Sequence, residues 1–281
     1  MTLTVTLLVL LAAVLHAGWN AMVKSTGDRL VMMAWIAGST SVIAAPIAVF
    51  VGIPGQDVWP FLLFSVCIHT GYMLLLVLAY THGDFGQVYP LARGLAPAVV
   101  TLAGFLIVGE TLSHLALIGI ALIAGGIISL AWQNPNGPAA ARDLRGVGYA
   151  LATGAAIATY SVVDGIGGRT ADTPVAYTAW LFLLHGIPIT LITLIRRGRA
   201  QMLASRRVAM AGVGGAAMSM LAYGIVIWAM DHAPLGPVSA LRETSVVFGA
   251  LISALVLREG LGRLAVVSAI VVAAGVILLK I

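Results

Sequence analysis

Charged residues are scarce in this sequence. Only 9% of its 281 residues are Asp, Glu, Lys or Arg, whereas 60% are hydrophobic. A soluble domain usually carries about 25% charged residues. A chain with so little charge cannot face water on all sides, so the composition excludes an ordinary soluble domain and predicts an integral membrane protein.

Cysteine and catalytic motifs are also scarce. The lone cysteine, Cys67, excludes an intrachain disulfide. The sequence has no His-Glu-x-x-His zinc motif, no Gly-x-Ser-x-Gly elbow and no phosphate-binding loop. We therefore expect no enzymatic activity and no cofactor. Any active transport would be driven by an ion gradient or by the gradient of the substrate itself.

Apolar runs follow one another along the whole chain. Each is close to the roughly 20 residues that a helix needs to cross a bilayer. The first run has no basic residue ahead of it and no clear cleavage site, so we expect a retained helix rather than a signal peptide. The sequence predicts an all-α membrane protein with ten transmembrane helices over 2–23, 31–52, 58–81, 86–108, 112–132, 146–165, 174–195, 208–230, 235–257 and 261–280.

The two halves of the chain resemble each other. Ala79, His82, Gly86, Val88 and Leu91 recur as Ala229, His232, Gly236, Val238 and Leu241. After one residue drops out, Arg93, Glu110 and Leu112 recur as Arg242, Glu259 and Leu261. The pattern predicts a first five-helix repeat over 1–133, a linker over 134–145 and a second repeat over 146–281. Because five is odd, the second repeat must start on the opposite side of the membrane, which predicts inverted repeats around a central cavity.

Three short stretches carry a resemblance to a known family. Gly18-Trp19-Asn20 with Lys24 ends the first span, Gly109-Glu110-Thr111-Leu112 follows the fourth, and Arg258-Glu259-Gly260-Leu261 follows the ninth. With ten spans, these stretches resemble the EamA-type members of the drug/metabolite transporter superfamily over nearly the whole chain. The resemblance implies transport of small metabolites, such as amino acids, nucleotide-like molecules, amines or drugs, and termini in the cytoplasm.

The loop charges indicate the opposite orientation. One side would carry only Arg169 and Lys280. The other would carry Lys24, Arg29, Arg142, Arg145, Arg196, Arg197, Arg199, Arg206, Arg207, Arg258 and Arg263. Basic loops usually stay in the cytoplasm. In a bacterial inner membrane this bias places both termini in the periplasm, so the charges and the resemblance disagree about orientation.

Three ionisable residues, Arg93, Arg242 and Glu243, fall inside predicted spans. A charge at the centre of a bilayer costs about 2.5–3.5 kcal/mol or more, so such residues tend to face a cavity or a partner. The two arginines occupy matching repeat positions, and inversion should bring both to the centre, where a guanidinium can hold a carboxylate or phosphate. Glu243 would neutralise an arginine or receive a substrate amine. The alternative is a purely structural ion pair.

Polar and aromatic residues are expected around these charges. We predict that the substrate path is lined by Trp19, Asn20, Tyr72, Tyr89, Tyr160 and Tyr223. Interfacial belts and interhelical hydrogen bonds are the alternatives for these residues. The candidates for proton coupling are His16, His185 and Asp164. The alternatives are packing roles for the histidines and, for Asp164, a carboxylate that faces the lipid headgroups.

The sequence thus predicts an alternating-access transporter for an amino-acid-like metabolite, zwitterionic or anionic, that works as a monomer or homodimer and binds no nucleic acid. Two other functions stay open. In an exporter of cationic or aromatic drugs, Glu243 and the rings would bind the substrate and the arginines would be structural. An intramembrane enzyme acting on lipid-linked substrates would need a nucleophile or paired acids at depth, which Glu243 alone does not supply.

Overall fold

The computed structural model describes the whole chain except residues 25, 83–84, 133–143, 257–262 and 281. All regular structure in the described ranges is helical. The elements are α1 (Leu3–Lys24), α2 (Arg29–Val51), α3 (Trp59–His82), α4 (Phe85–Gly94), α5 (Ala96–Ala103), the π-helix η1 (Gly104–Val108), α6 (His114–Ser129), the 3-10 helix η2 (Leu130–Trp132), α7 (Leu144–Thr170), α8 (Pro174–Leu203), α9 (Arg206–His232), α10 (Leu235–Glu243), α11 (Ser245–Val256) and α12 (Arg263–Leu278).

Eight helical stretches of the described chain are long and apolar enough to cross a membrane, and they coincide with the predicted spans one to four and six to nine. α6 and α12 occupy the predicted fifth and tenth spans but are shorter, at 16 residues each. α6 begins at His114 rather than at 112 because the Ser113 hydroxyl accepts a hydrogen bond from the Ala116 amide and caps the helix there. The predicted linker, 134–145, lies almost entirely outside the described residues, and α7 already begins at Leu144.

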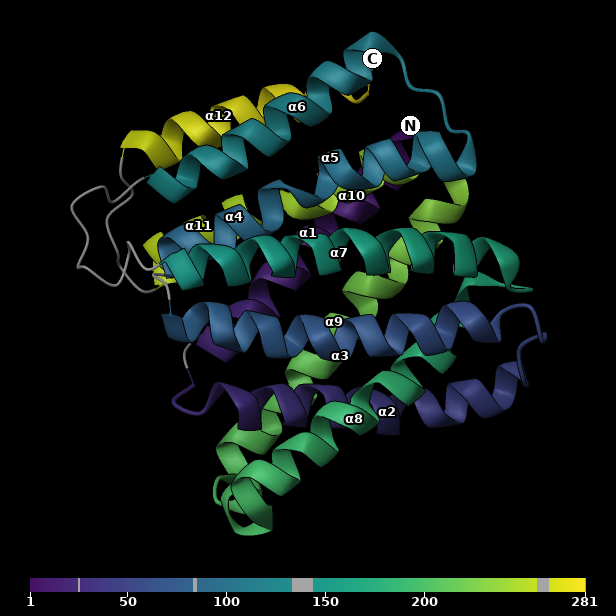
Figure 1. The fold of residues 1–281 in the computed structure, drawn as a ribbon, viewed down its shortest axis with the longest axis vertical. Coiled ribbons are helices and arrows are strands. Elements are labelled where there is room, and N and C mark those ends of the chain that lie inside the picture. The colour runs from purple at the N-terminus through teal and green to yellow at the C-terminus, as the bar shows by residue number, and fades with distance from the viewer. Residues whose placement is uncertain (25, 83–84, 133–143, 257–262, 281) are drawn as a thin grey trace.

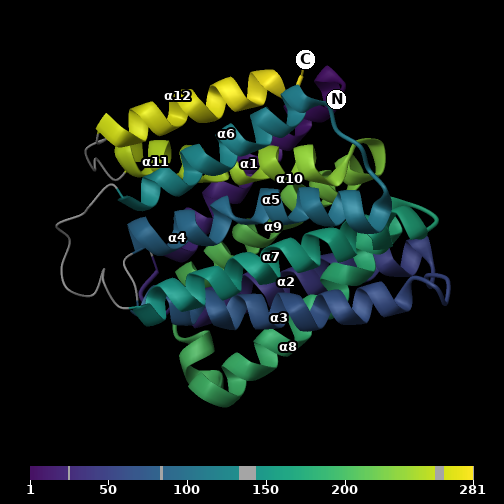
Figure 2. The same cartoon turned by 45° about the horizontal axis from the view of Figure 1, so that its top comes forward.

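The helices lie in layers, with α6 and α12 at one end of the molecule and α2 and α8 at the other (Figure 1). Between these two pairs, α1 packs against α9 and α3 packs against α7. The two chain ends lie close together at the same side of the bundle (Figures 1 and 2). The helices of the two halves therefore interleave, so that every layer contains helices from both.

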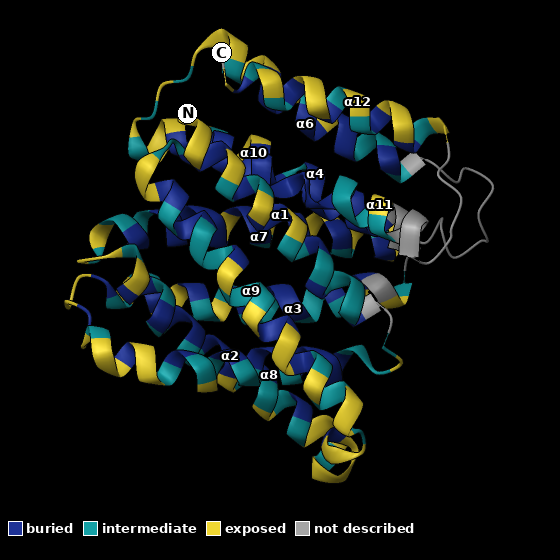
Figure 3. Ribbon diagram, turned by 180° about the vertical axis from the view of Figure 1, so that it is seen from behind, coloured by how far each residue is buried: buried dark blue, intermediate teal, exposed yellow. Residues whose placement is uncertain are grey.

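The outer surface of the bundle is apolar. Val49 is 83% exposed, Phe50 is 91% exposed and Ile195 is 84% exposed. Figure 3 shows exposed positions along the outward sides of the helices and buried positions between them. Apolar side chains on the outside and helices that satisfy their own backbone are what a lipid environment requires.

The fourth and ninth spans, predicted over 86–108 and 235–257, are each interrupted among the described residues. α4 ends before Leu95, and α5 follows with Pro97 in its first turn. Proline lacks an amide donor and restricts the residue before it, which explains this break. α10 ends before Thr244, whose hydroxyl donates to the Leu241 carbonyl at 2.6 Å and whose own amide also bonds that carbonyl. This local bonding competes with the regular helical ladder.

Candidate substrate site

Two arginines and one carboxylate meet at the centre of the molecule. Arg93 Nη1 donates to Glu243 Oε2 at 3.0 Å. Arg242 donates to the other oxygen, Oε1, through Nε at 2.9 Å and through Nη2 at 2.6 Å. Glu243 is fully buried, and the two arginines are only 1% and 2% exposed. We call Arg93, Arg242 and Glu243 the arginine triad.

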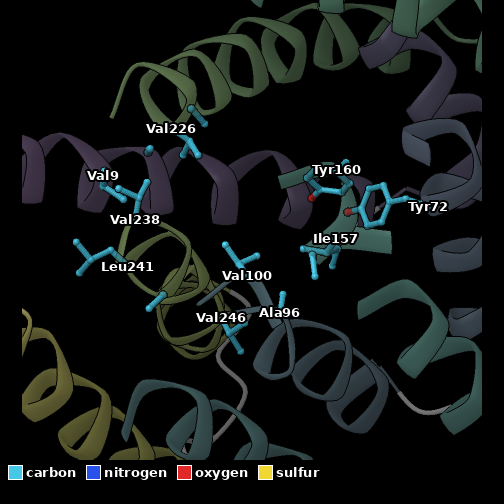
Figure 4. Packing of buried hydrophobic residues seen from close by; sticks show 14 of the residues in the cluster. Val9, Tyr72, Ala96, Val100, Ile157, Tyr160, Val226, Val238, Leu241 and Val246 are labelled. Atoms are coloured by element: carbon cyan, nitrogen blue, oxygen red, sulfur yellow. The ribbon is translucent and has the colours of Figure 1, made fainter. Parts of the chain in front are cut away.

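The breaks in the fourth and ninth spans position the triad. Arg93 lies two residues before the break at Leu95, and Arg242 lies two residues before the break at Thr244. α5 packs directly against α10, so the interrupted spans cross each other at this point. Val100 of α5, Val238 of α10 and Val246 of α11 all belong to the main apolar core around this crossing (Figure 4).

The surroundings of Arg93 come mainly from α1, α3 and α4. Its Nη2 contacts His16 Nε2 at 2.5 Å and the Tyr72 hydroxyl at 3.5 Å. The guanidinium also lies 5.4 Å from the centre of the Tyr89 ring. Because an arginine always donates, His16 Nε2 must accept and therefore carries no proton. The structure thus brings Tyr72 and Tyr89, which were predicted to line the substrate path, and His16, which was predicted for proton coupling, to Arg93.

Arg242 contacts α7. Its Nη2 donates to the Ser161 hydroxyl at 3.1 Å, and its guanidinium lies 5.7 Å from the centre of the Tyr160 ring. Tyr160 and Tyr72 lie next to each other at the edge of the same core, with ring centres 5.5 Å apart (Figure 4). Arg242 Nη1 is buried and has no hydrogen-bond partner among the described residues. A buried charged donor without a partner is costly, so it marks a place where a ligand group would be stabilised.

A second polar cluster surrounds Asp164. Tyr177 donates its hydroxyl proton to Asp164 Oδ1 at 2.8 Å, and the Tyr223 hydroxyl bonds Oδ2. His69 Nε2 lies 3.9 Å from Oδ2. Asp164 is fully buried, so the alternative that it faces the lipid headgroups is wrong. The carboxylate lies inside the bundle because Tyr177 of α8 and Tyr223 of α9 supply hydrogen bonds in place of water. We call His69, Asp164, Tyr177 and Tyr223 the aspartate cluster.

The remaining predicted residues lie around the two groups. The Trp19 ring packs edge-on against His16 at 4.9 Å, and its Nε1 is buried with no partner among the described residues. The Asn20 side chain donates to the carbonyl of His16 within its own helix at 2.8 Å. His185 is buried, with its ring centre 5.4 Å from that of His69.

Sequence reasoning missed His69 and Tyr177. His69 lies one helical turn before Tyr72, and this spacing places both on one face of α3. That pattern was a usable signal. Tyr177 was harder to find, because it lies near the start of a helix, where tyrosines commonly face the membrane interface.

A separate charged contact lies at the ends of several helices. Arg169 donates to Glu110 Oε1 at 2.8 Å and to the carbonyls of Met230 at 2.7 Å and Ala233 at 3.0 Å. Glu110 Oε2 accepts from the Leu235 amide at 2.9 Å. This clasp of Glu110 and Arg169 joins the end of the fourth span, α7, the end of α9 and the start of α10.

Comparison with known proteins gives two likenesses. Residues 144–281 match the sequence profile of the EamA-like transporter family. A crystal structure of another protein is similar to this chain with a TM-score of 0.74 and 15% identity, over 98% of this chain and 94% of the other. At that identity the likeness concerns the fold alone. No curated protein matches the chain by sequence.

Proposed function

We propose that the chain is a secondary transporter working by alternating access, because residues 144–281 match the sequence profile of the EamA-like transporter family. The substrate is a small polar metabolite, amino-acid-like and either zwitterionic or anionic. The membrane is the bacterial inner membrane, and the five helices of each half form inverted repeats.

The pattern of helix neighbours supports the inverted repeats. If the halves are related by symmetry, each span corresponds to the span five places away in the other half, so α1 corresponds to α7 and α3 corresponds to α9. The contact of α1 with α9 should then have a counterpart between α7 and α3, and both contacts exist. The same correspondence relates the contact of α2 with α9 to that of α8 with α3. Breaks at Leu95 and Thr244 and arginines at the matching positions 93 and 242 agree with the same correspondence. A two-fold axis between the halves would produce each of these pairs.

The charge of the arginine triad carries the substrate assignment. A purely structural ion pair would be balanced, whereas here two guanidiniums share one carboxylate. One positive charge is left over within the triad, and Arg242 Nη1 has no partner among the described residues. A substrate carboxylate or phosphate would supply both the missing charge and the missing acceptor. This excess of positive charge favours an anionic group over the cation that a drug exporter would bind.

The orientation follows from the loop charges. The Asp28–Arg197 ion pair, in which Arg197 Nε and Asp28 Oδ2 are 2.7 Å apart, belongs to the face that carries most of the basic residues. The Glu110–Arg169 clasp joins helix ends that the same topology places at the opposite face. We assign the basic face to the cytoplasm and both termini to the periplasm. The clasp joins the end of the fourth span to α7, α9 and α10, so access from its face requires these bonds to open.

The test is counterflow in proteoliposomes that are preloaded with a mixture of amino acids and supplied outside with the same mixture radiolabelled. Arg242→Gln should lose at least tenfold of the uptake, since one lost charge-assisted bond is worth about 1.5–3 kcal/mol. Arg199→Gln is the matched control, because Arg199 is exposed at the end of α8. Uptake by Arg242→Gln equal to that of Arg199→Gln would remove the triad from the substrate path.

A further inference from the structure

We propose that His69 and Asp164 together bind one proton, and that this proton is carried in the same direction as the substrate. The inference rests on the proposed transport function and adds the coupling ion and its site. It also separates the predicted coupling residues: Asp164 is retained, His69 is added, and His16 and His185 are left out.

Hydrogen bonding fixes the state of the His69 ring. Its Nδ1 lies 3.1 Å from the Ser65 carbonyl oxygen and 3.1 Å from the Ser65 hydroxyl, one turn earlier in α3. A carbonyl only accepts, so Nδ1 carries a hydrogen and donates. In a neutral imidazole this leaves Nε2 with a lone pair.

That lone pair faces the Asp164 carboxylate. Nε2 lies 3.9 Å from Oδ2, and the carboxylate is completely buried. Without a proton the two atoms are both acceptors and have nothing to exchange. One proton changes this: a hydronium ion gives up the proton and becomes water, and the proton binds to Nε2 or to Oδ2. The protonated atom then faces an acceptor 3.9 Å away, and the charge of the pair rises by one.

Several polar and aromatic groups of the described residues surround this pair. Asp164 faces Tyr177 from α8 and Tyr223 from α9, and His69 faces His185 from α8 at 5.4 Å between ring centres. The His69 ring stacks on Tyr160 of α7 at 4.0 Å, and the guanidinium of Arg242 from α10 lies 5.7 Å from the centre of the same Tyr160 ring. His16 is unsuitable because its Nε2 already accepts from Arg93, and a proton there would place two cations in contact. His185 Nδ1 has no partner among the described residues, so no bond would hold a proton there.

The arrangement joins the proton to the substrate and to the helices. The Tyr160 ring contacts both His69 and Arg242, so a proton on the His69–Asp164 pair adds positive charge near the arginine triad and strengthens the binding of an anion there. By linkage, the anion then strengthens proton binding to the same extent. A proton on Oδ2 also weakens the bond from Tyr223, which ties α9 to α7. Proton binding therefore loosens the contact between α7 and α9, both in the second half of the chain, and at the same time favours binding of the anion at the arginine triad.

Infrared difference spectroscopy between alkaline and acidic buffer tests the proton site without any substrate. The protein in lipid should gain either the C=O band of a buried carboxylic acid or the ring band of an imidazolium. Asp164→Asn should remove this signal completely. Asp172→Asn, at an exposed position after α7, should leave it unchanged. If Asp164→Asn does not fold, His69→Gln should move or abolish the same signal. A signal that persists in both variants, or no signal in the wild type, overturns the proposal.

A second experiment separates the proton site from the transport function. In proteoliposomes with the amino acid mixture, an acidic exterior should stimulate wild-type uptake, and Asp164→Asn should lose the stimulation while it retains exchange of labelled for unlabelled substrate. Stimulation that survives in Asp164→Asn overturns the coupling. If the wild type moves no amino acid, the transport proposal fails for this substrate class, and the infrared result still decides whether His69 and Asp164 bind a proton.

Discussion

Replacing Glu243 by glutamine should strongly destabilise the protein. The carboxylate is fully buried and accepts from Arg93 at 3.0 Å and from Arg242 at 2.6 and 2.9 Å. Glutamine keeps the size of the side chain but leaves two buried guanidiniums side by side with no negative charge between them. Removing one partner of a buried ion pair typically costs about 3–5 kcal/mol. We expect a loss of this size in the free energy of unfolding, measured by SDS titration in mixed micelles.

A triple variant distinguishes a structural triad from a functional one. With Arg93→Met, Arg242→Met and Glu243→Met combined, all three charges disappear together, and apolar replacement of a buried charged group is often neutral or stabilising. Stability should therefore return to within about 1–2 kcal/mol of the wild type, while counterflow of amino acids stays lost. If Glu243→Gln loses less than about 1 kcal/mol, the carboxylate does not hold the arginines as described. If the triple variant transports normally, the triad has no role in the substrate path.

Three further predictions address the packing, the orientation and the clasp. Gly275→Ala should lower the free energy of unfolding by about 1–3 kcal/mol, because the new Cβ would lie 2.7 Å from the Gly119 carbonyl oxygen. The matched control is Gly125→Ala in α6, where nothing lies within 4 Å of the new Cβ. In a melting assay this control should be neutral or slightly stabilising. Gln201→Cys in a Cys67→Ala background should react with an impermeant thiol reagent only from the cytoplasmic side; labelling from the periplasm alone would reverse the orientation. Arg169→Gln, introduced into a Ser161→Cys variant, should at least double the rate at which the impermeant thiol reagent labels residue 161 from the periplasmic side. The reason is that it removes the bonds of Arg169 to Glu110, Met230 and Ala233. An unchanged rate would show that the clasp does not limit access.

Much of the architecture could be predicted from the sequence, because hydropathy and length determine whether a helix can cross a bilayer. The predicted spans coincide with the helices to within a few residues in most cases. The internal repeat also predicted that Arg93 and Arg242 would both face the centre between the halves, and in the structure both contact Glu243. The spans and the matching arginines depend on hydropathy and on repeated residues along the chain, so the sequence alone is enough to predict them.

The details that depend on long-range contacts could not be predicted. The break at Leu95 had a visible cause in Pro97, but the break at Thr244 contains no proline and arises from local hydrogen bonds. Asp164 near the end of a span resembles an interfacial carboxylate until α8 and α9 supply Tyr177 and Tyr223. The role of His69 likewise depends on a residue 95 positions later, as its distance of 3.9 Å to Asp164 shows. Such partners are determined by packing of the helices.

The central claim is that Arg242 and its neighbour Ser161 lie on a path open in turn to each side of the membrane. Ser161 accepts from Arg242 at 3.1 Å and is completely buried in this conformation. The most direct test is the labelling of Ser161→Cys, in the Cys67→Ala background, with an impermeant thiol reagent in right-side-out and in inside-out vesicles. We predict slow labelling from both sides, reduced by the amino acid mixture. Labelling from neither side, or from one side only, would contradict the account.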